Sequence, residues 1–164
     1  HPVLSRSHRC GSMKTFRASA PVRLDLAGAW TDVAPFATEV GCIVVNAAIE
    51  LRAHAEVIVG GDRYYLRSDD LDDQLDFATP EEFPRDGRLA LLKAALRLSD
   101  PGPCQLRTWS EAPPGSGLGT SGAMDVALIA ALDAARGVHR THVKVAEAGY
   151  RLETLEAAHA GGNF

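Results

Sequence analysis

The chain has 164 residues, a formal net charge of −4 and 46% hydrophobic residues. This length suits one domain that buries roughly 70% of its unfolded surface. An acidic balance without a basic stripe argues against a nucleic-acid partner, and no apolar run approaches the ~20 residues of a membrane helix. Three widely spaced cysteines predict neither a disulfide framework nor a zinc site, so we expect a cytoplasmic protein without membrane contact.

The N-terminal segment differs in character from the rest of the chain. Residues 1–12 are basic and polar and lack the apolar stretch of a secretory signal. We therefore expect residues 1–12 to be a disordered extension or a cloning remnant. The domain is predicted over residues 13–164.

Strand patterns dominate the first half of that domain. Residues 15–26 alternate and predict one or two strands. Residues 42–49 form a continuous apolar run, which is typical of a buried strand. Residues 51–59 alternate again, and Gly60-Gly61-Asp62 then predicts a hairpin into residues 63–67.

An acidic stretch, a helix and a further strand follow. Residues 68–84 carry five aspartates and predict a solvated loop or a cluster that attracts a metal. Residues 89–98 have helical spacing and end at a Pro- and Gly-rich turn. Residues 105–110 predict a strand that leads into the next segment.

Helices close the sequence. Residues 121–135 predict an amphipathic helix that ends at Gly137, and Thr141 is placed to cap a last helix that runs to about residue 160. Strands followed by helices on one face of a sheet indicate a two-layer α+β domain.

A glycine-rich stretch precedes the first of these two helices. Gly115, Gly117 and Gly119 allow close approach of a ligand to the backbone, and Thr120 and Ser121 open the helix. The N–H groups and positive dipole end of such a helix favour a phosphate. The alternative is an ordinary turn, since the segment has neither the P-loop pattern nor Gly-x-Gly-x-x-Gly.

Residues 113–123 read Pro-Pro-Gly-Ser-Gly-Leu-Gly-Thr-Ser-Gly-Ala. This run resembles the second motif of the GHMP kinases, the family of galactokinase, homoserine kinase, mevalonate kinase and phosphomevalonate kinase. In that family, Pro-x-Gly-x-Gly-Leu-Gly-Ser-Ser-x-Ala wraps the phosphates of ATP. The resemblance implies these ATP-binding residues: Pro114, Gly115, Ser116, Gly117, Leu118, Gly119, Thr120 and Ser121.

Residues 20–32 read Ala-Pro-Val-Arg-Leu-Asp-Leu-Ala-Gly-Ala-Trp-Thr-Asp. They resemble the first GHMP motif, in the form found in fucokinases and heptose-phosphate kinases, and residues 41–49 resemble the strand that follows it. The resemblance covers about residues 15–162. It implies the fold of the N-terminal GHMP domain, which is like domain 2 of ribosomal protein S5.

Phosphoryl transfer needs mainly positioning and charge neutralisation. By resemblance, Arg23 is the catalytic cation, although an arginine in an alternating strand also suits solvent or an ion pair with Asp25. Asp32 would hold sugar hydroxyls, or be an ordinary turn residue. Trp30 would stack on the sugar, or be a core aromatic.

The resemblance implies ATP and Mg²⁺ as cofactors. Mg²⁺ prefers oxygen ligands. Ser121 and Glu153 are the expected ligands, with Glu156 one turn away as the fallback. The alternative roles are helix capping for the hydroxyls of Thr120 and Ser121, and solvent-facing helix charges for Glu147, Glu153 and Glu156.

Family members continue with Gln-Asp-Gln, whose aspartate is the catalytic base, and with a C-terminal domain. This sequence instead ends Gly161-Gly162-Asn163-Phe164, so the expected base aspartate is absent. We expect an ATP-dependent sugar or sugar-phosphate kinase in a truncated form without full activity. The alternative is a nucleotide-binding module without turnover. The face that a C-terminal domain would cover is expected to be apolar and to permit a homodimer.

Overall fold

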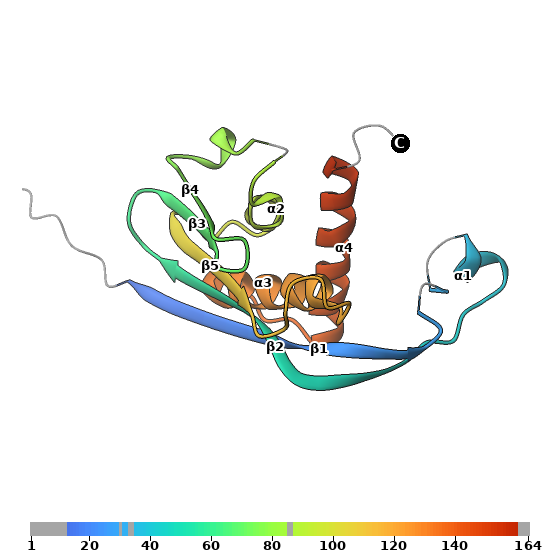
Figure 1. The fold of residues 1–164 in the computed structure, drawn as a ribbon. Helices are drawn as coiled ribbons and strands as arrows, with labels where there is room; N and C mark the ends of the chain where they lie inside the picture. The colour runs from blue at the N-terminus through green and yellow to red at the C-terminus, as the bar shows by residue number, and fades with distance from the viewer. Residues whose placement is uncertain (1–12, 30, 33–34, 85–86, 161–164) are drawn as a thin grey trace, which may run out of the picture.

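The computed structural model describes residues 13–29, 31–32, 35–84 and 87–160, with side chains up to residue 154. Within that part, five strands form one sheet and the three long helices lie on one side of it, with α3 against the strands (Figure 1). The elements are β1 (Lys14–Ala27), α1 (Phe36–Glu39), β2 (Val45–Val59), β3 (Tyr64–Ser68), β4 (Asp73–Phe77), a 3-10 turn (Pro80–Glu82), α2 (Ala90–Leu98), β5 (Cys104–Ser110), α3 (Thr120–Arg136) and α4 (His142–Ala160). The two-layer α+β prediction is confirmed, and the prediction for residues 1–12 lies outside the described residues.

The order of the strands corrects one prediction. The sheet runs β1-β2-β5-β3-β4, with β3 parallel to β5 and the other neighbours antiparallel. The predicted hairpin between residues 51–59 and 63–67 is therefore wrong, because β5 lies between β2 and β3. Strand β5 is central and pairs with β2 on one side and with β3 on the other. Its residues alternate between buried and exposed from Cys104 to Thr108, because only one face of the sheet is covered by helices.

The first strand agrees with the prediction of one or two strands, and the second differs from its prediction. Residues 15–26 lie in one strand that continues through Pro21, where the register shifts; β1 is at the edge of the sheet, where a proline is tolerated. The buried strand predicted over residues 42–49 is wrong. Strand β2 starts at Val45 and its first residues are largely exposed, since β1 is their only neighbouring strand.

The acidic stretch is neither an open loop nor a metal cluster. It contains β4, which forms a hairpin with β3. Two of its carboxylates lie in ion pairs with arginines outside the stretch, Asp73 with Arg88 and Asp76 with Arg63. Across the described residues, no group of three or more His, Cys, Asp or Glu side chains is arranged to hold a metal.

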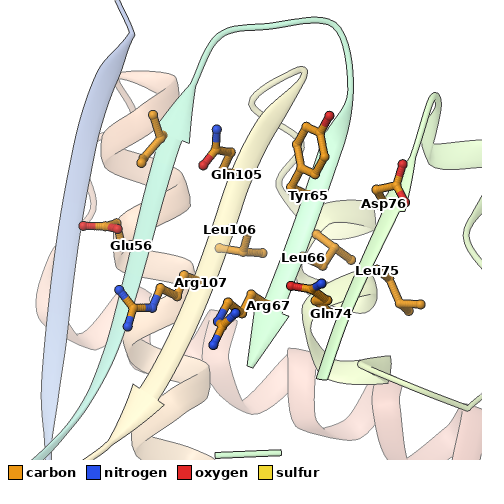
Figure 2. Close-up of a pocket in the computed structure, with 11 residues that line it drawn as sticks. Glu56, Tyr65, Leu66, Arg67, Gln74, Leu75, Asp76, Gln105, Leu106 and Arg107 are labelled. Atoms are coloured by element: carbon orange, nitrogen blue, oxygen red, sulfur yellow. The ribbon is translucent and has the colours of Figure 1, made fainter. Parts of the chain in front are cut away.

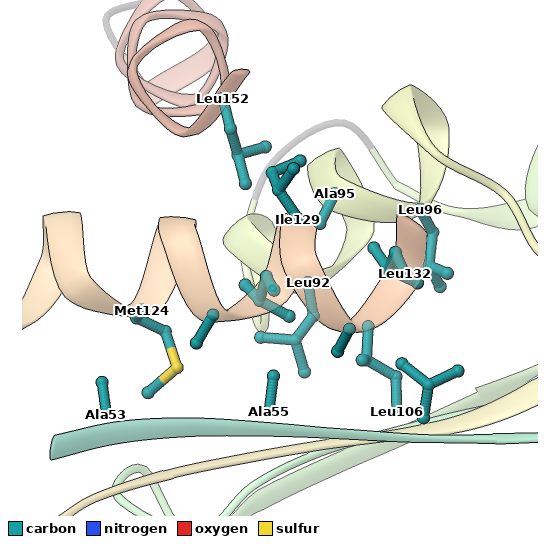
Figure 3. Close-up of a cluster of buried hydrophobic side chains, with 14 of the residues drawn as sticks. Ala53, Ala55, Leu92, Ala95, Leu96, Leu106, Met124, Ile129, Leu132 and Leu152 are labelled. Atoms are coloured by element: carbon teal, nitrogen blue, oxygen red, sulfur yellow. The ribbon is translucent and has the colours of Figure 1, made fainter. Parts of the chain in front are cut away.

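The core lies between the sheet and α3. Small side chains on the inner face of the sheet allow α3 to lie close to the strands, and α2 and α4 pack on α3 from the other side (Figure 3). The buried residues at these contacts include Ala53, Ala55 and Leu106 from the sheet, Met124, Ile129 and Leu132 from α3, Leu92, Ala95 and Leu96 from α2, and Leu152 from α4.

The three long helices match their predicted bounds closely. Helix α3 ends at Gly137, whose φ of 69° is left-handed, and the N–H of Lys144 donates to the Thr141 hydroxyl at 3.4 Å at the start of α4. None of the described helices has the length and hydropathy needed to cross a membrane.

Candidate functional site

The glycine-rich loop, residues 112–119, joins the end of β5 to the start of α3. The residue before α3 is Gly119, and no side chain caps the helix. The structure thus contradicts the alternative in which Thr120 or Ser121 caps it, because both are already helical. The first N–H groups of α3 therefore have no intrahelical acceptor and lie at the positive end of its dipole.

The loop backbone is open to a ligand. Gly115, Gly117 and Gly119 have φ angles of 72°, 70° and 68°, and residues 113–117 are exposed. Gly119 is favoured by its left-handed backbone angle, and a Cβ there would lie 3.0 Å from Nη1 of Arg23, so the arginine side chain lies directly over this residue. A loop of this shape presents main-chain N–H groups without side-chain cover.

Arg23 lies against this loop. Its N–H donates to the carbonyl of Leu118 at 2.9 Å, and its guanidinium passes over Gly119. The Nε of Arg23 donates to Oδ1 of Asp25 at 3.0 Å, so the pairing expected for these two residues is confirmed. Since half of the Arg23 side chain is exposed, a cation is available beside the N–H groups of the loop.

The start of the loop is held by Glu111. Its carboxylate accepts a hydrogen bond from the N–H of Arg52 at 2.9 Å and lies 3.0 Å from Nε2 of His54. The hydrogen bond with His54, followed by that with Arg52, holds the pKa of Glu111 below its usual value. Glu111 was not among the residues predicted from the sequence; the available signal was an acidic residue directly before a glycine-rich loop.

Asp32, one of the two expected sugar-binding residues, lies beyond the C-terminal end of β1. Asp32 is exposed and follows a turn in which the N–H and hydroxyl of Thr31 both donate to the carbonyl of Gly28, at 3.1 and 2.6 Å. A Cβ at Gly28 would lie 1.9 Å from the carbonyl oxygen of Ile43, which explains the glycine. Trp30 lies outside the described residues.

The expected carboxylate of the metal site is on α4. Glu153 is exposed, four residues after Gly149, whose missing side chain lets α4 approach Val126 of α3. Glu147 pairs with Lys144 at 2.7 Å on the surface. The side chain of Glu156 is outside the described part of the chain.

A separate groove of about 560 Å³ lies on the sheet face away from the helices (Figure 2). Arg67 and Arg107, which face each other on β3 and β5, both donate to the carboxylate of Asp69 and lower its pKa. Glu56 at the same face pairs with Arg17. These charged groups are paired with one another. The residues that line the groove do not include the glycine-rich loop.

Comparison with known proteins identifies relatives of the chain. Residues 88–163 match the family model described as GHMP kinases N terminal domain. A D-glycero-alpha-D-manno-heptose 7-phosphate kinase of Campylobacter jejuni is 29% identical over 157 residues, which are 92% of this chain and 46% of the relative. A bifunctional fucokinase/GDP-fucose pyrophosphorylase of Arabidopsis thaliana is 26% identical over 79% of this chain and 14% of its own length.

Solved structures of sugar kinases are also similar to the chain. A D-glycero-D-manno-heptose 1-phosphate kinase from Bacteroides thetaiotaomicron has a TM-score of 0.75 at 27% identity, covering 85% of this chain and 48% of that one. A galactokinase from Lactococcus lactis, complexed with galactose, has a TM-score of 0.70 at 20% identity, covering 92% and 39%; it shares the fold. The chain thus spans about half the length of the heptose kinases it matches.

Proposed function

We propose that this chain, which carries the N-terminal domain of a GHMP kinase and is related to the sugar kinases of that family, binds ATP with Mg²⁺ for transfer of the γ-phosphate to a sugar or sugar-phosphate hydroxyl. The observation that carries the proposal is the uncapped N-terminus of α3 behind a loop of left-handed glycines, with Arg23 alongside. The kinase reaction is proposed for the whole protein.

The loop suits the phosphates of ATP. Main-chain N–H groups between Gly115 and Ser121 would donate to phosphate oxygens, as helix N-termini do for anions. Arg23 would stabilise negative charge on the transferred group, because its guanidinium already touches the loop at Gly119. Pro114, Ser116, Leu118 and Thr120 complete the proposed ATP-binding segment.

Hydroxyl and carboxylate oxygens are available for Mg²⁺. The Ser121 hydroxyl is exposed on the first turn of α3 and the Glu153 carboxylate is exposed on α4, so both fit the oxygen ligands that this ion prefers. When bound, Mg²⁺ would neutralise charge on the phosphates. Asp32 would accept hydrogen bonds from sugar hydroxyls and Trp30 would stack on the ring.

The direct test is calorimetric titration of the protein with ATP in the presence of Mg²⁺. We expect binding by the wild-type chain and affinity about tenfold lower for Arg23→Gln, because a charge-assisted contact to phosphate is lost. The matched control is Arg17→Gln, which removes another ion-paired arginine of β1 away from the loop and should leave the affinity unchanged. Absence of ATP binding by the wild-type chain at millimolar concentration would refute the proposal.

The second candidate is a nucleotide-binding module without turnover. It needs only the glycine-rich loop and the adjacent Arg23, which lie together in the described residues. A turnover assay with fucose, galactose and heptose phosphates, run beside the calorimetry, separates the two functions. ATP binding with no phosphorylated product from any acceptor supports the module.

We further propose that the isolated chain forms a homodimer through an apolar arm. The arm consists of the C-terminal end of β1, helix α1 and the start of β2. This arm extends past the helices that cover the rest of the sheet (Figure 1). Its large apolar side chains are exposed: Leu24, Leu26, Phe36, Val40, Ile43 and Val45. Exposed apolar side chains favour association with another protein surface.

Val40→Ser is expected to weaken self-association measured by sedimentation equilibrium, because Val40 is 71% exposed on the arm. The matched control is Val143→Ser on α4, where the valine is 67% exposed away from the arm. Equal dissociation constants for the two variants, or a monomeric wild-type chain, would exclude a dimer through this surface.

A further inference from the structure

The carboxylate of Glu111 bridges the glycine-rich loop to a strand that is not adjacent in sequence. Its two oxygens contact two residues of β2, the N–H of Arg52 at 2.9 Å and Nε2 of His54 at 3.0 Å. The N–H of Glu111 also donates to the carbonyl of Arg52 at 2.9 Å. Three contacts therefore fix the residue from which the loop departs.

Both partners of Glu111 are themselves held in place. The ring of His54 stacks on Trp109, with centroids 4.9 Å apart and planes 5° apart, and the guanidinium of Arg107 lies 5.2 Å from the Trp109 ring. The Nε of Arg52 donates to the hydroxyl of Ser19 at 2.8 Å, across to β1. The bridge is thus part of a network that spans β1, β2 and β5.

The loop is fastened again where it ends. There the carbonyl of Leu118 accepts the N–H of Arg23, from β1. Between these two points, residues 113–117 are exposed, and a Cβ at Gly115 or Gly117 would have no atom within 4 Å. Because both ends of the loop are held, ordering it around a ligand costs less entropy than ordering a loop whose start is loose.

We infer that Glu111 is a positioning residue for the glycine-rich loop, holding its start on β2 so that its N–H groups are ordered before an anion binds. The inference deepens the proposed function and rests on it for the identity of the anion, the triphosphate of ATP. Glu111 is not a catalytic residue, because its carboxylate is taken up by Arg52 and His54. Its effect on the loop exists without nucleotide and is measurable in the free protein.

The test compares Glu111→Ala and Glu111→Gln with a matched control, Glu147→Gln. Glu147 is a glutamate of similar exposure whose carboxylate pairs with Lys144 on α4, so the control removes the same charge elsewhere. Amide hydrogen exchange is measured by NMR in the free protein at the two hydrogen-bonded N–H groups that report on the loop, those of Ser116 and Arg23, which donate to the carbonyls of Pro113 and Leu118. ATP affinity is measured by calorimetry with Mg²⁺. The strands β2 and β5 provide the internal reference for exchange.

We expect Glu111→Ala to speed exchange at the Ser116 and Arg23 amides about tenfold and to weaken ATP binding about fivefold, since two side-chain hydrogen bonds are lost. Glu111→Gln should restore much of the protection, because its amide oxygen still accepts the N–H of Arg52. Glu147→Gln should match the wild-type chain in both measurements.

Unchanged loop exchange in Glu111→Ala would overturn the inference, whatever the ATP affinity. Exchange that rises equally in β2 and β5 would also overturn it, because Glu111 would then stabilise the whole sheet. Faster exchange confined to the loop, in a protein that binds no ATP, would support the positioning role while refuting the proposed nucleotide function.

Discussion

Ala55→Leu is expected to lower the free energy of unfolding by about 3 kcal/mol, the upper end of the cost of overpacking a core. Ala55 is fully buried on β2 beneath α3, beside Ala53, and both lie close to the helix (Figure 3). A leucine there has to push α3 away from the sheet or adopt a strained rotamer, because a packed interior has no space for three more carbon atoms. Urea denaturation followed by circular dichroism measures the change.

Ala146→Leu is the control for this substitution. Ala146 is exposed on α4, away from both the sheet and the apolar arm. The same side-chain change there should alter stability by less than about 0.5 kcal/mol, as surface substitutions usually do. If both variants lost stability equally, the small side chains of β2 would not be what sets the distance between α3 and the sheet.

The same packing links the core to the candidate site. Helix α3 rests on the alanines of the sheet and carries the uncapped N-terminus at which the loop ends. A displacement of α3 in Ala55→Leu would therefore also shift Gly119 relative to Arg23, whose guanidinium is within 3.0 Å of a Cβ at that position. The position of the loop depends on a core residue of β2 as well as on the glycines.

The helices could be predicted from the sequence because their signals are local. The spacing of apolar residues in α2 and α3 and the left-handed Gly137 each act within a few residues. The strand–loop–helix unit from β5 to α3 is local for the same reason. The glycine-rich motif lies inside that unit, so it was placed correctly at the start of a helix.

The strand order could not be predicted in this way. Strand β5 pairs with β2 at Val57 and Leu106, which are far apart in the sequence. The turn residues 60–62 indicate where the chain reverses, but they do not indicate that a later strand will pair with β2 in place of β3. The apolar run over residues 42–49 was wrongly expected to be buried, because apolar content indicates burial only where another layer covers the strand. Here the covering helix ends before the arm.

In the candidate site, too, residues in local motifs could be predicted, whereas residues brought together by strand pairing could not. The loop residues were found by motif, and the contact of Arg23 with the loop joins two motifs that the sequence separates. Glu111 and His54 are 57 residues apart and carry no local pattern. Their contact depends on the pairing of β2 with β5, so it could be identified only once the sheet register was known.

Leu152→Ala is expected to lower the free energy of unfolding by about 3 kcal/mol, within the range for deleting a buried leucine. Leu152 is fully buried and is the one large, fully buried side chain among the residues of α4 whose side chains the structure describes, 142–154. Helix α4 packs mainly on α3 and α2, so loss of this anchor should loosen α4 before the sheet. Hydrogen exchange should therefore rise more in α4 than in β2 or β5.

The matched control is Leu71→Ala, since Leu71 is 68% exposed between β3 and β4 and should contribute little. Equal losses in the two variants would show that α4 does not depend on Leu152.

The substitution also bears on the proposed metal site, because Glu153 is the next residue and has no fixed position once α4 is loose. If Glu153 binds Mg²⁺ with Ser121, then Leu152→Ala and Glu153→Gln should both reduce the dependence of ATP affinity on Mg²⁺. If only Glu153→Gln did so, the carboxylate would reach the metal without a docked α4.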